Sequence, residues 1–276
     1  MSRRAARRAL PERQVDEYLA FACRLAELAG DAILPHFRTA IEVHNKAGAR
    51  GYDPVTIADR AAEESIRREI ARRYPSHGIH GEELGKVAGR DSLTWVIDPI
   101  DGTRSFIIGQ LHWGTLIALN DGERPILGVM HQPYVGETFT GSPRGAHLRR
   151  AGAARRLRIR RCPRLENAVL CTTHPELFTT WDERSAFGKI AERAKLTRYG
   201  GDCYSYCLLA AGLVDLVIEA GLYPYDVQAL IPIVEGAGGV MTSWAGETAY
   251  EGGQVVAAGD PKLHRIAVGI LSRAVA

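Results

Sequence analysis

The chain has 276 residues, of which 46% are hydrophobic and 24% are charged, and its formal net charge is +3. This length suffices for one large α/β domain, or for two joined subdomains, with a buried core. The composition is typical of a globular protein, and no apolar run approaches the roughly 18–20 residues that cross a bilayer. Because the net charge is also small, we expect neither a membrane nor a nucleic acid as a partner.

The cysteines and the N-terminal residues bear on the compartment. Five cysteines occur, an odd number without a Cys-x-x-Cys pair, so we expect neither a disulfide framework nor a zinc site. This usage fits a reducing cytosol, and we expect a cytoplasmic protein. Residues 1–8 are basic but precede no apolar segment, which argues against a secretory signal. An organellar transit peptide is the alternative to a simple basic tail.

The first half of the chain predicts an α+β arrangement. Apolar residues at helical spacing favour a helix over residues 14–37. Thr56 and Asp59 have the spacing of a capping box, which opens a second helix that ends near Tyr74. The later pattern predicts short strands and a hairpin with an Asp-Gly turn. The expected strands include residue 79 and residues 93–97, 115–119, 126–130 and 137–140.

An arginine-rich segment, residues 149–161, lies in the middle of the chain. It contains seven arginines, and residues 156–160 alternate charged and apolar side chains as a strand does. An edge strand protected by charge, or a solvated link between subdomains, would explain the segment. A strip that binds a polyanion is the alternative. We therefore divide the chain into residues 1–150 and residues 151–276.

The second half predicts alternating strands and helices, as in α/β proteins. Cys203 and Cys207 are four residues apart and would share one face of a helix in the core. The expected helices cover residues 184–194, 203–212 and 227–236, with a last one from about residue 261. The expected strands cover residues 168–172, 197–199, 213–219, 240–243 and 255–258.

Two aspartates follow the apolar run at residues 95–97. Asp98 and Asp101 are three residues apart and flank Pro99, which interrupts a regular strand ladder. Oxygen donors held on a stiff turn are what Mg²⁺ requires. Gly102 would let the chain turn sharply, and the amides that follow would point at a phosphate, as at a helix N-terminus. A lone pair of this kind more often caps a turn.

The other acidic positions also have structural explanations when each is taken alone. Glu82 and Glu83 have the pattern of a solvated surface. Asp226 precedes an apolar run and is a natural helix N-cap. Asp53 lies just before the capping box, where a turn would account for it.

Four segments occur together and in order, and through them the sequence resembles the inositol-monophosphatase superfamily of lithium-sensitive, metal-dependent sugar phosphatases. The family motifs are D-x-V-T-x-x-D, G-E-E, W-x-x-D-P-I-D-G-T, and a late D ahead of a helix that closes in G-A-G-G. They correspond here to residues 53–59, 81–83, 95–103 and 226–239. The resemblance covers nearly the whole chain beyond the first dozen residues.

The resemblance implies a five-layer αβαβα sandwich, in which an α+β half precedes an α/β half, and usually a homodimer. It also implies two or three Mg²⁺ ions. Glu82, Asp98 and the Ile100 carbonyl would hold the first ion. Asp98, Asp101 and Asp226 would hold the second, with Asp98 bridging the two.

The implied reaction is hydrolysis of a small phosphate monoester by a metal-activated water, without a covalent phosphoenzyme. Two metals about 4 Å apart would neutralise the ester and steady the departing alkoxide. Thr103 and Asp53 would orient and deprotonate the attacking water, and Glu82 would complete the catalytic group. The amides of Gly102 and Thr103 would bind the phosphoryl group.

Three further segments look like the histidinol-phosphate phosphatase branch of this superfamily. They are residues 102–106, 198–204 and 220–226. In the last of them Tyr225 replaces the tryptophan that commonly precedes the final aspartate. That departure weakens an inositol phosphate assignment more than it weakens the metal site.

The substrate assignment depends mainly on one acidic residue. Asp202 occupies a position where many inositol monophosphatases have a small residue. Together with Glu219 it would make an anionic pocket for the amine and imidazole of L-histidinol phosphate. Arg104 and Gly201 would complete the substrate site. Alternatively, Asp202 caps the helix that begins near Cys203.

Other functions remain open from the sequence. The same chemistry would act on inositol phosphate, a nucleotide 3′-phosphate or fructose bisphosphate, although a bisphosphate favours extra basic residues over two acids. A non-catalytic regulatory protein would be expected to lack a metal carboxylate or Thr103, and all are present. A nucleic-acid role would depend on the arginine-rich segment.

Overall fold

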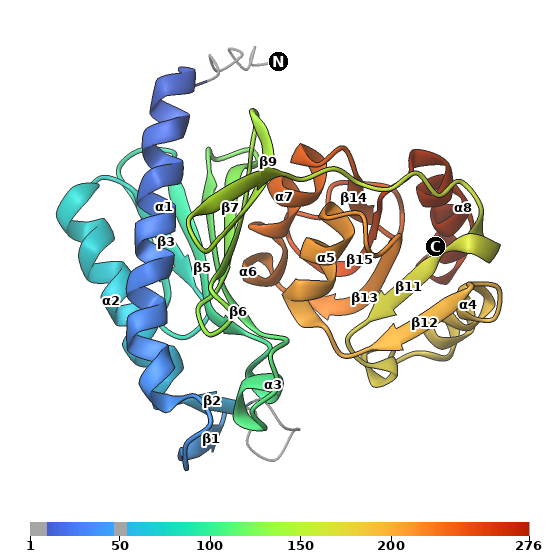
Figure 1. Cartoon of the computed structure of the whole chain (residues 1–276), viewed down its shortest axis with the longest axis horizontal. Helices are drawn as coiled ribbons and strands as arrows, with labels where there is room; N and C mark the ends of the chain where they lie inside the picture. Colours follow the sequence, from blue (N-terminus) through green and yellow to red (C-terminus); the bar gives the residue numbers. More distant parts are fainter. Residues whose placement is uncertain (1–9, 47–53, 276) are drawn as a thin grey trace.

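The computed structural model describes residues 10–46 and 54–275. Five layers alternate helices and sheets, which confirms the expected αβαβα sandwich (Figure 1). The outer layer at the N-terminal side contains α1 (Glu12–Ile33) and α2 (Ile57–Arg73). The middle layer contains α5 (Asp202–Ala210), α6 (Pro224–Val227) and α7 (Leu230–Gly236). The other outer layer contains α4 (Trp181–Ala191) and α8 (Pro261–Leu271).

The first sheet has eight strands in the order β10-β9-β8-β7-β6-β5-β3-β4, among the residues described. Its strands are mostly antiparallel, and only the β3–β5 pair is parallel. The strands are β3 (Gly78–Gly81), β4 (Gly85–Val87), β5 (Thr94–Asp101), β6 (Gly114–Asn120), β7 (Pro125–Gln132), β8 (Glu137–Ser142), β9 (Gly145–Arg150) and β10 (Ala153–Arg156). This sheet therefore continues to Arg156, six residues beyond the division at residue 150 expected from the sequence.

The second sheet has five described strands in the order β12-β11-β13-β15-β14. The pairs of β11 with β12 and with β13 are parallel, and the other two pairs are antiparallel. The strands are β11 (Val169–Thr172), β12 (Leu196–Tyr199), β13 (Leu216–Leu222), β14 (Val240–Ser243) and β15 (Gly253–Ala258). The remaining elements are β1 (Val43–Asn45), which pairs with β2 (Pro54–Thr56), a short helix α3 (Thr103–Ile107), and 3₁₀ turns at Leu34–His36, Leu165–Asn167, Pro175–Leu177 and Ser272–Ala274.

Side-chain alternation along the strands explains why each sheet is covered on both faces. On β5, Val96 packs into the core between the two sheets, whereas Ile97 packs against α1 and α2. On β13, Val217 faces the middle layer and Ile218 faces the outer helices. Because both faces of each sheet are apolar, helices are required on both sides.

Two glycines let the middle helices lie directly on the first sheet. A Cβ atom at Gly128 on β7 would lie 1.9 Å from the Ala229 carbonyl oxygen. A Cβ atom at Gly141 on β8 would lie 2.2 Å from the Ile233 amide nitrogen. Real Cβ atoms do not approach other atoms so closely, so these positions fix the depth at which α6 and α7 sit.

Most expected elements are present with boundaries shifted by a few residues. The capping box at Thr56 and Asp59 is confirmed, since the Asp59 carboxylate accepts from the Thr56 amide at 2.8 Å. The expected single helix over residues 227–236 is wrong, because two short helices, α6 and α7, occupy this region. Pro232 has no N–H to donate to the carbonyl of Gln228, so a continuous helix cannot form there.

Of the two structural explanations for residues 156–160, the strand is wrong and the link is confirmed. Strand β10 ends at Arg156, and the chain then leaves the sheet as an extended link. Leu157 is buried in the core between the sheets, and the Ile159 amide donates to the Ala237 carbonyl at 3.2 Å. Arg160 binds Asp215 with two hydrogen bonds, at 3.0 and 2.5 Å. The alternating pattern thus belongs to a linker whose apolar residues pack inward.

Two exclusions made from the sequence can be compared with the structure. All five cysteines are free thiols, and Cys203 and Cys207 are buried on α5 as expected. Among the described residues, no helix is both long and apolar enough to span a bilayer.

We predict that Gly128→Ala lowers the free energy of unfolding by about 1–3 kcal/mol, because the new methyl group forces α6 and α7 away from the sheet. Gly188→Ala is the matched control, since a Cβ atom there meets nothing within 4 Å and the position is inside α4. We expect the control to be stabilised by about 0.5–1 kcal/mol. Urea denaturation of both variants measures the difference, and equal stability would contradict the close approach.

Candidate active site

The end of β5 brings two of the predicted ligands to the edge of the first sheet. Strand β5 pairs with β6 regularly up to Asp98, and the register then shifts before Asp101. Pro99 lies at this irregularity, as its missing N–H requires. Gly102 follows with φ +83°, and a Cβ atom there would lie 2.6 Å from the His112 carbonyl oxygen. The left-handed turn therefore needs glycine, and it aims the chain into α3.

Asp226 reaches the same place from the middle layer. Its carboxylate accepts a hydrogen bond of 2.6 Å from the Tyr223 amide, which fixes it at the start of α6. One carboxylate oxygen from each of Asp98, Asp101 and Asp226 lies within 4.8 Å of the others. Residues 128 positions apart in the chain are thus joined into one acidic cluster.

Burial and mutual repulsion disfavour the charged forms of these carboxyl groups. Burial raises the pKa of Asp98 well above its usual range, and the charges of Glu82, Asp101 and Asp226 raise it further. Burial raises the pKa of Asp101 to about 6, although the Cys203 amide donates to its carboxylate at 2.7 Å. A cation at this cluster would relieve the repulsion.

Glu82 lies beside this cluster, just after β3. Its side chain accepts a 2.8 Å hydrogen bond from the Lys46 ammonium, which also binds Glu83 at 2.7 Å. The turn is held by Glu63 of α2, whose fully buried carboxylate accepts from the amides of Glu83 and Leu84 at 2.8 and 3.2 Å. The sequence analysis missed Lys46 and Glu63.

No local signal marked either of these two residues. Glu63 pairs with Arg67 four positions later on α2, which has the appearance of an ordinary helical ion pair. Its second role depends on Gly81, where a Cβ atom would lie 2.0 Å from the Glu63 carboxylate. Lys46 precedes Glu82 by 36 positions and Glu83 by 37, and only the fold brings the three together.

The donor set fits a hard divalent cation. Asp98 is only 2% exposed, and no described residue hydrogen-bonds its Oδ1 atom. Buried carboxylate oxygens are normally paired or coordinate a metal. Oxygen atoms clustered on a rigid turn suit Mg²⁺ in particular. Asp98, which the family resemblance implies as the bridging metal ligand, therefore has a carboxylate oxygen without a described hydrogen-bond partner.

The predicted phosphate-binding residues Gly102 and Thr103 lie on this turn. Thr103 begins α3, and its hydroxyl donates to the Ile100 carbonyl at 2.9 Å. This bond places Thr103 directly against the backbone oxygen proposed as a metal ligand. Asp53, the expected partner of Thr103 in activating water, lies outside the described residues.

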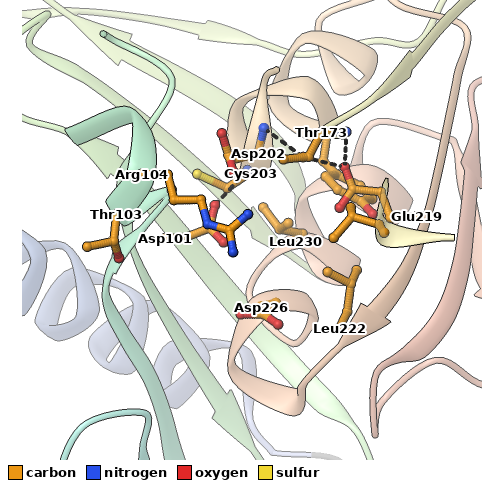
Figure 2. Close-up of a pocket in the computed structure, with 13 residues that line it drawn as sticks. Asp101, Thr103, Arg104, Thr173, Asp202, Cys203, Glu219, Leu222, Asp226 and Leu230 are labelled. Carbon is orange, nitrogen blue, oxygen red and sulfur yellow. Dashed lines mark hydrogen bonds between the residues drawn. The ribbon is translucent and has the colours of Figure 1, made fainter. Parts of the chain in front are cut away.

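A cavity of about 210 Å³ opens next to the acidic cluster and lies between the two halves of the chain. Figure 2 shows Asp101 and Asp202 close together, Thr173 and Glu219 toward the other side of the cavity, and Asp226 at the bottom of the view. The volume of this cavity is smaller than the roughly 300–1,000 Å³ of sites that bind drug-sized ligands. The lining residues are Asp101, Gly102, Thr103, Arg104, Thr173, Leu177, Asp202, Cys203, Tyr206, Glu219, Leu222, Asp226 and Leu230.

Thr173 joins the two acids that the sequence assigned to substrate binding. Its hydroxyl donates to the Glu219 carboxylate at 2.7 Å and accepts from the Asp202 amide at 3.1 Å. Its own amide donates to the same Glu219 oxygen at 3.1 Å. Thr173 therefore links the backbone of Asp202, on α5, to the side chain of Glu219, on β13.

Both acids have raised pKa values. Burial, together with the neighbouring charges of Asp202 and Asp101, raises the pKa of Glu219 to about 8. Burial and the charge of Asp101 raise the pKa of Asp202 to about 7, against the opposing effect of Arg104. A bound cation would lower both pKa values and ionise the pair.

Asp202 does not cap α5, so this alternative from the sequence is wrong. Its carboxylate instead accepts from the Ser105 hydroxyl of α3 at 3.2 Å. The N-cap is Gly201, which does not line the cavity. Asp202 has φ +42°, a left-handed conformation that costs a non-glycine residue about 1 kcal/mol or more. Such strain is commonest at functional sites.

Among the described residues that line this cavity, Arg104 is the one basic side chain. It extends from α3 into the space beside Asp101 (Figure 2). Its positive charge opposes the rise in the pKa of Asp202. The pocket thus has both acids and a base in its lining, which suits a ligand that carries both charges.

Comparison with known proteins identifies the family. The model of the inositol monophosphatase family matches residues 14–275. The chain belongs to the inositol monophosphatase family. Members of this family are metal-dependent phosphoric monoester hydrolases, and the chain is an enzyme of this class.

Individual relatives carry more than one functional name. The chain is 42% identical over 273 residues to the chloroplastic bifunctional phosphatase IMPL2 of Arabidopsis thaliana, covering 94% of this chain and 76% of that protein. It is 34% identical to a histidinol-phosphatase of Chlorobaculum parvum, covering 86% and 89%. An inositol monophosphatase structure from Zymomonas mobilis matches with a TM-score of 0.82 and 40% identity, covering 96% and 100%.

We predict that Asp98→Asn stabilises the metal-free phosphatase while abolishing its stabilisation by Mg²⁺. Removing one buried negative charge relieves repulsion in the cluster, but it also removes the predicted bridging ligand. Thermal unfolding in EDTA measures the stability of the metal-free protein. Thermal unfolding at Mg²⁺ concentrations raised in roughly tenfold steps measures the stabilisation by Mg²⁺. Glu192→Gln, an exposed change of equal charge on the C-cap of α4, is the control and should alter neither.

We predict that Glu219→Gln weakens the pH dependence of stability in the metal-free enzyme. The pKa of Glu219 is about 8 when folded, against the ordinary 4.5. The folded state therefore holds this proton more tightly, and the corresponding stability is lost as pH rises through this window. The variant should gain about 2 kcal/mol over the wild type at pH 8.5, and much less at pH 5. Denaturant titrations in EDTA at both pH values test this, and parallel curves would contradict it.

Proposed function

We propose that this phosphatase hydrolyses L-histidinol phosphate to L-histidinol and phosphate, with Mg²⁺ as its metal. The observation that carries the proposal is the pair of acids, Asp202 and the buried Glu219, that line the cavity beside the metal cluster. A phosphate bound at the cluster would place its alcohol part against this pair. Histidinol phosphate offers an ammonium group and an imidazole there, which are suitable partners for carboxylates.

Each residue has a definite part in the proposed reaction. Glu82, Asp98, Asp101, Asp226 and the Ile100 carbonyl would hold two or three Mg²⁺ ions. Bound Mg²⁺ would neutralise the phosphate charge and lower the pKa of an attacking water. The Thr103 hydroxyl donates to the Ile100 carbonyl, so its lone pairs are directed to accept a hydrogen bond from that water. The amides of Gly102 and Thr103 would bind the phosphoryl oxygens.

The substrate half of the site would orient the alcohol part. Thr173 holds Glu219 in place through two hydrogen bonds, so the carboxylate loses little freedom when a ligand binds. Arg104 would contact the phosphate from the outer side, where its side chain enters the cavity. We propose that residues after the arginine-rich link supply specificity, while residues before it supply most metal ligands.

Inositol 1-phosphate is the second candidate substrate. The 40% identity to the inositol monophosphatase of Zymomonas mobilis favours it. Carboxylates also accept hydrogen bonds from a polyol, so the acid pair does not exclude this ester. A cation should nevertheless gain more from two buried carboxylates than a neutral polyol does.

We predict that phosphate release with Mg²⁺ is at least about 100-fold faster in kcat/KM from L-histidinol phosphate than from inositol 1-phosphate, or about 2.7 kcal/mol. Fructose 1,6-bisphosphate and adenosine 3′,5′-bisphosphate complete the panel. Asp202→Asn, which keeps the shape but removes the charge, should lower kcat/KM for L-histidinol phosphate about 30-fold and for inositol 1-phosphate much less. A preference for inositol 1-phosphate would refute the substrate proposal and leave the metal site standing.

A further inference from the structure

Tyr206 lines the substrate cavity, but neither the metal site nor the acid pair accounts for it. It lies four residues after Asp202 on α5, and residues at this spacing share a helix face. It is 1% exposed, and no described residue hydrogen-bonds its hydroxyl group. A phenylalanine would fill the same space without burying a polar atom.

An unpaired buried hydroxyl is costly. Most buried polar side chains are hydrogen-bonded, and leaving one unpaired costs about 1–3 kcal/mol. Burial raises the pKa of Tyr206 well above its usual range, and the charges of Glu219, Asp101 and Asp226 raise it further. The hydroxyl therefore stays protonated, and it lies within the influence of both the substrate acids and the metal acids.

A second tyrosine on the same helix shows what a structural hydroxyl does here. Tyr204 donates to the Glu137 carboxylate on β8 and so ties α5 to the first sheet. Its hydroxyl is satisfied within the fold. The Tyr206 hydroxyl has no partner among the described residues, and Tyr206 lines the cavity, where a bound ligand would supply one.

We propose that the Tyr206 hydroxyl is a specificity determinant that accepts a hydrogen bond from an N–H group in the alcohol part of the substrate. It would act beside Glu219 and Asp202, which carry the compensating charge. This inference rests on the proposed function for the identity of that group. The placement of Tyr206 in the substrate half of the cavity does not depend on it.

The test compares Tyr206→Phe with Tyr204→Phe as the matched control. The probes are L-histidinol phosphate, inositol 1-phosphate and phenyl phosphate, whose alcohol part has no hydrogen-bonding group beyond the ester. In Tyr206→Phe, the ratio of kcat/KM for L-histidinol phosphate to that for phenyl phosphate should fall about tenfold, or about 1.4 kcal/mol. Thermal stabilisation by L-histidinol, measured with Mg²⁺ and phosphate present, should weaken in parallel.

Stability separates a ligand-binding hydroxyl from a structural one. The melting temperature of Tyr206→Phe should equal or exceed that of the wild type, because an unpaired polar group has been removed. Tyr204→Phe should melt lower and keep the wild-type substrate ratio. The proposal is overturned if Tyr206→Phe leaves the substrate ratio unchanged, or if its main effect is a lower melting temperature.

The two proposals fail in distinguishable ways. If the wild type prefers inositol 1-phosphate, the histidinol assignment and the N–H partner are both wrong. The ratio of inositol 1-phosphate to phenyl phosphate in Tyr206→Phe then decides the placement: a fall of about tenfold supports it, and no change refutes it. If L-histidinol phosphate is preferred and the ratio is unchanged, only the role of Tyr206 fails.

Discussion

The middle helix layer is the constraint on which the rest of this structure depends. Helices α5, α6 and α7 fill the space between two sheets, and Gly128 and Gly141 leave room for their backbone against the first sheet. This depth of packing places Asp226 beside the end of β5 and sets the N-terminus of α5 against Asp101 through the Cys203 amide. The acidic cluster and the substrate cavity both exist because this layer touches both sheets.

The site has been built at the expense of local stability. Several carboxyl groups are buried close together, with pKa values raised by burial and by one another, and the hydroxyl of Tyr206 is buried without a described partner. A fold selected for stability alone would replace these groups with apolar side chains. A bound cation would relieve the repulsion among the carboxylates, and the N–H partner that we propose would pair the Tyr206 hydroxyl.

Sequence reasoning recovered the layers, most elements and the three aspartates that the fold brings together, because periodicity and an ordered set of motifs encode them. It failed where tertiary contacts decide the outcome. Residues 156–160 alternate like a strand, yet they form a link whose apolar side chains pack inward. Glu63 and Lys46 support Glu82 from distant positions that carry no motif. Thr173 follows β11, and Tyr206 lies on α5. Their proposed roles depend on the fold, which brings both to one cavity with Glu219 of β13, and no spacing along the chain predicts this.

The cavity also has a consequence for how such enzymes diversify. Most residues of the metal cluster and the phosphate turn come from β3, β5 and α3, whereas Thr173, Asp202, Tyr206 and Glu219 all follow the link at residues 157–164. On the proposed roles, mutations at these four positions would alter which alcohol is accepted while the residues of β5 and α3 stay unchanged. A gene of this kind can drift from one metabolite to another by small steps, without passing through an inactive ancestor.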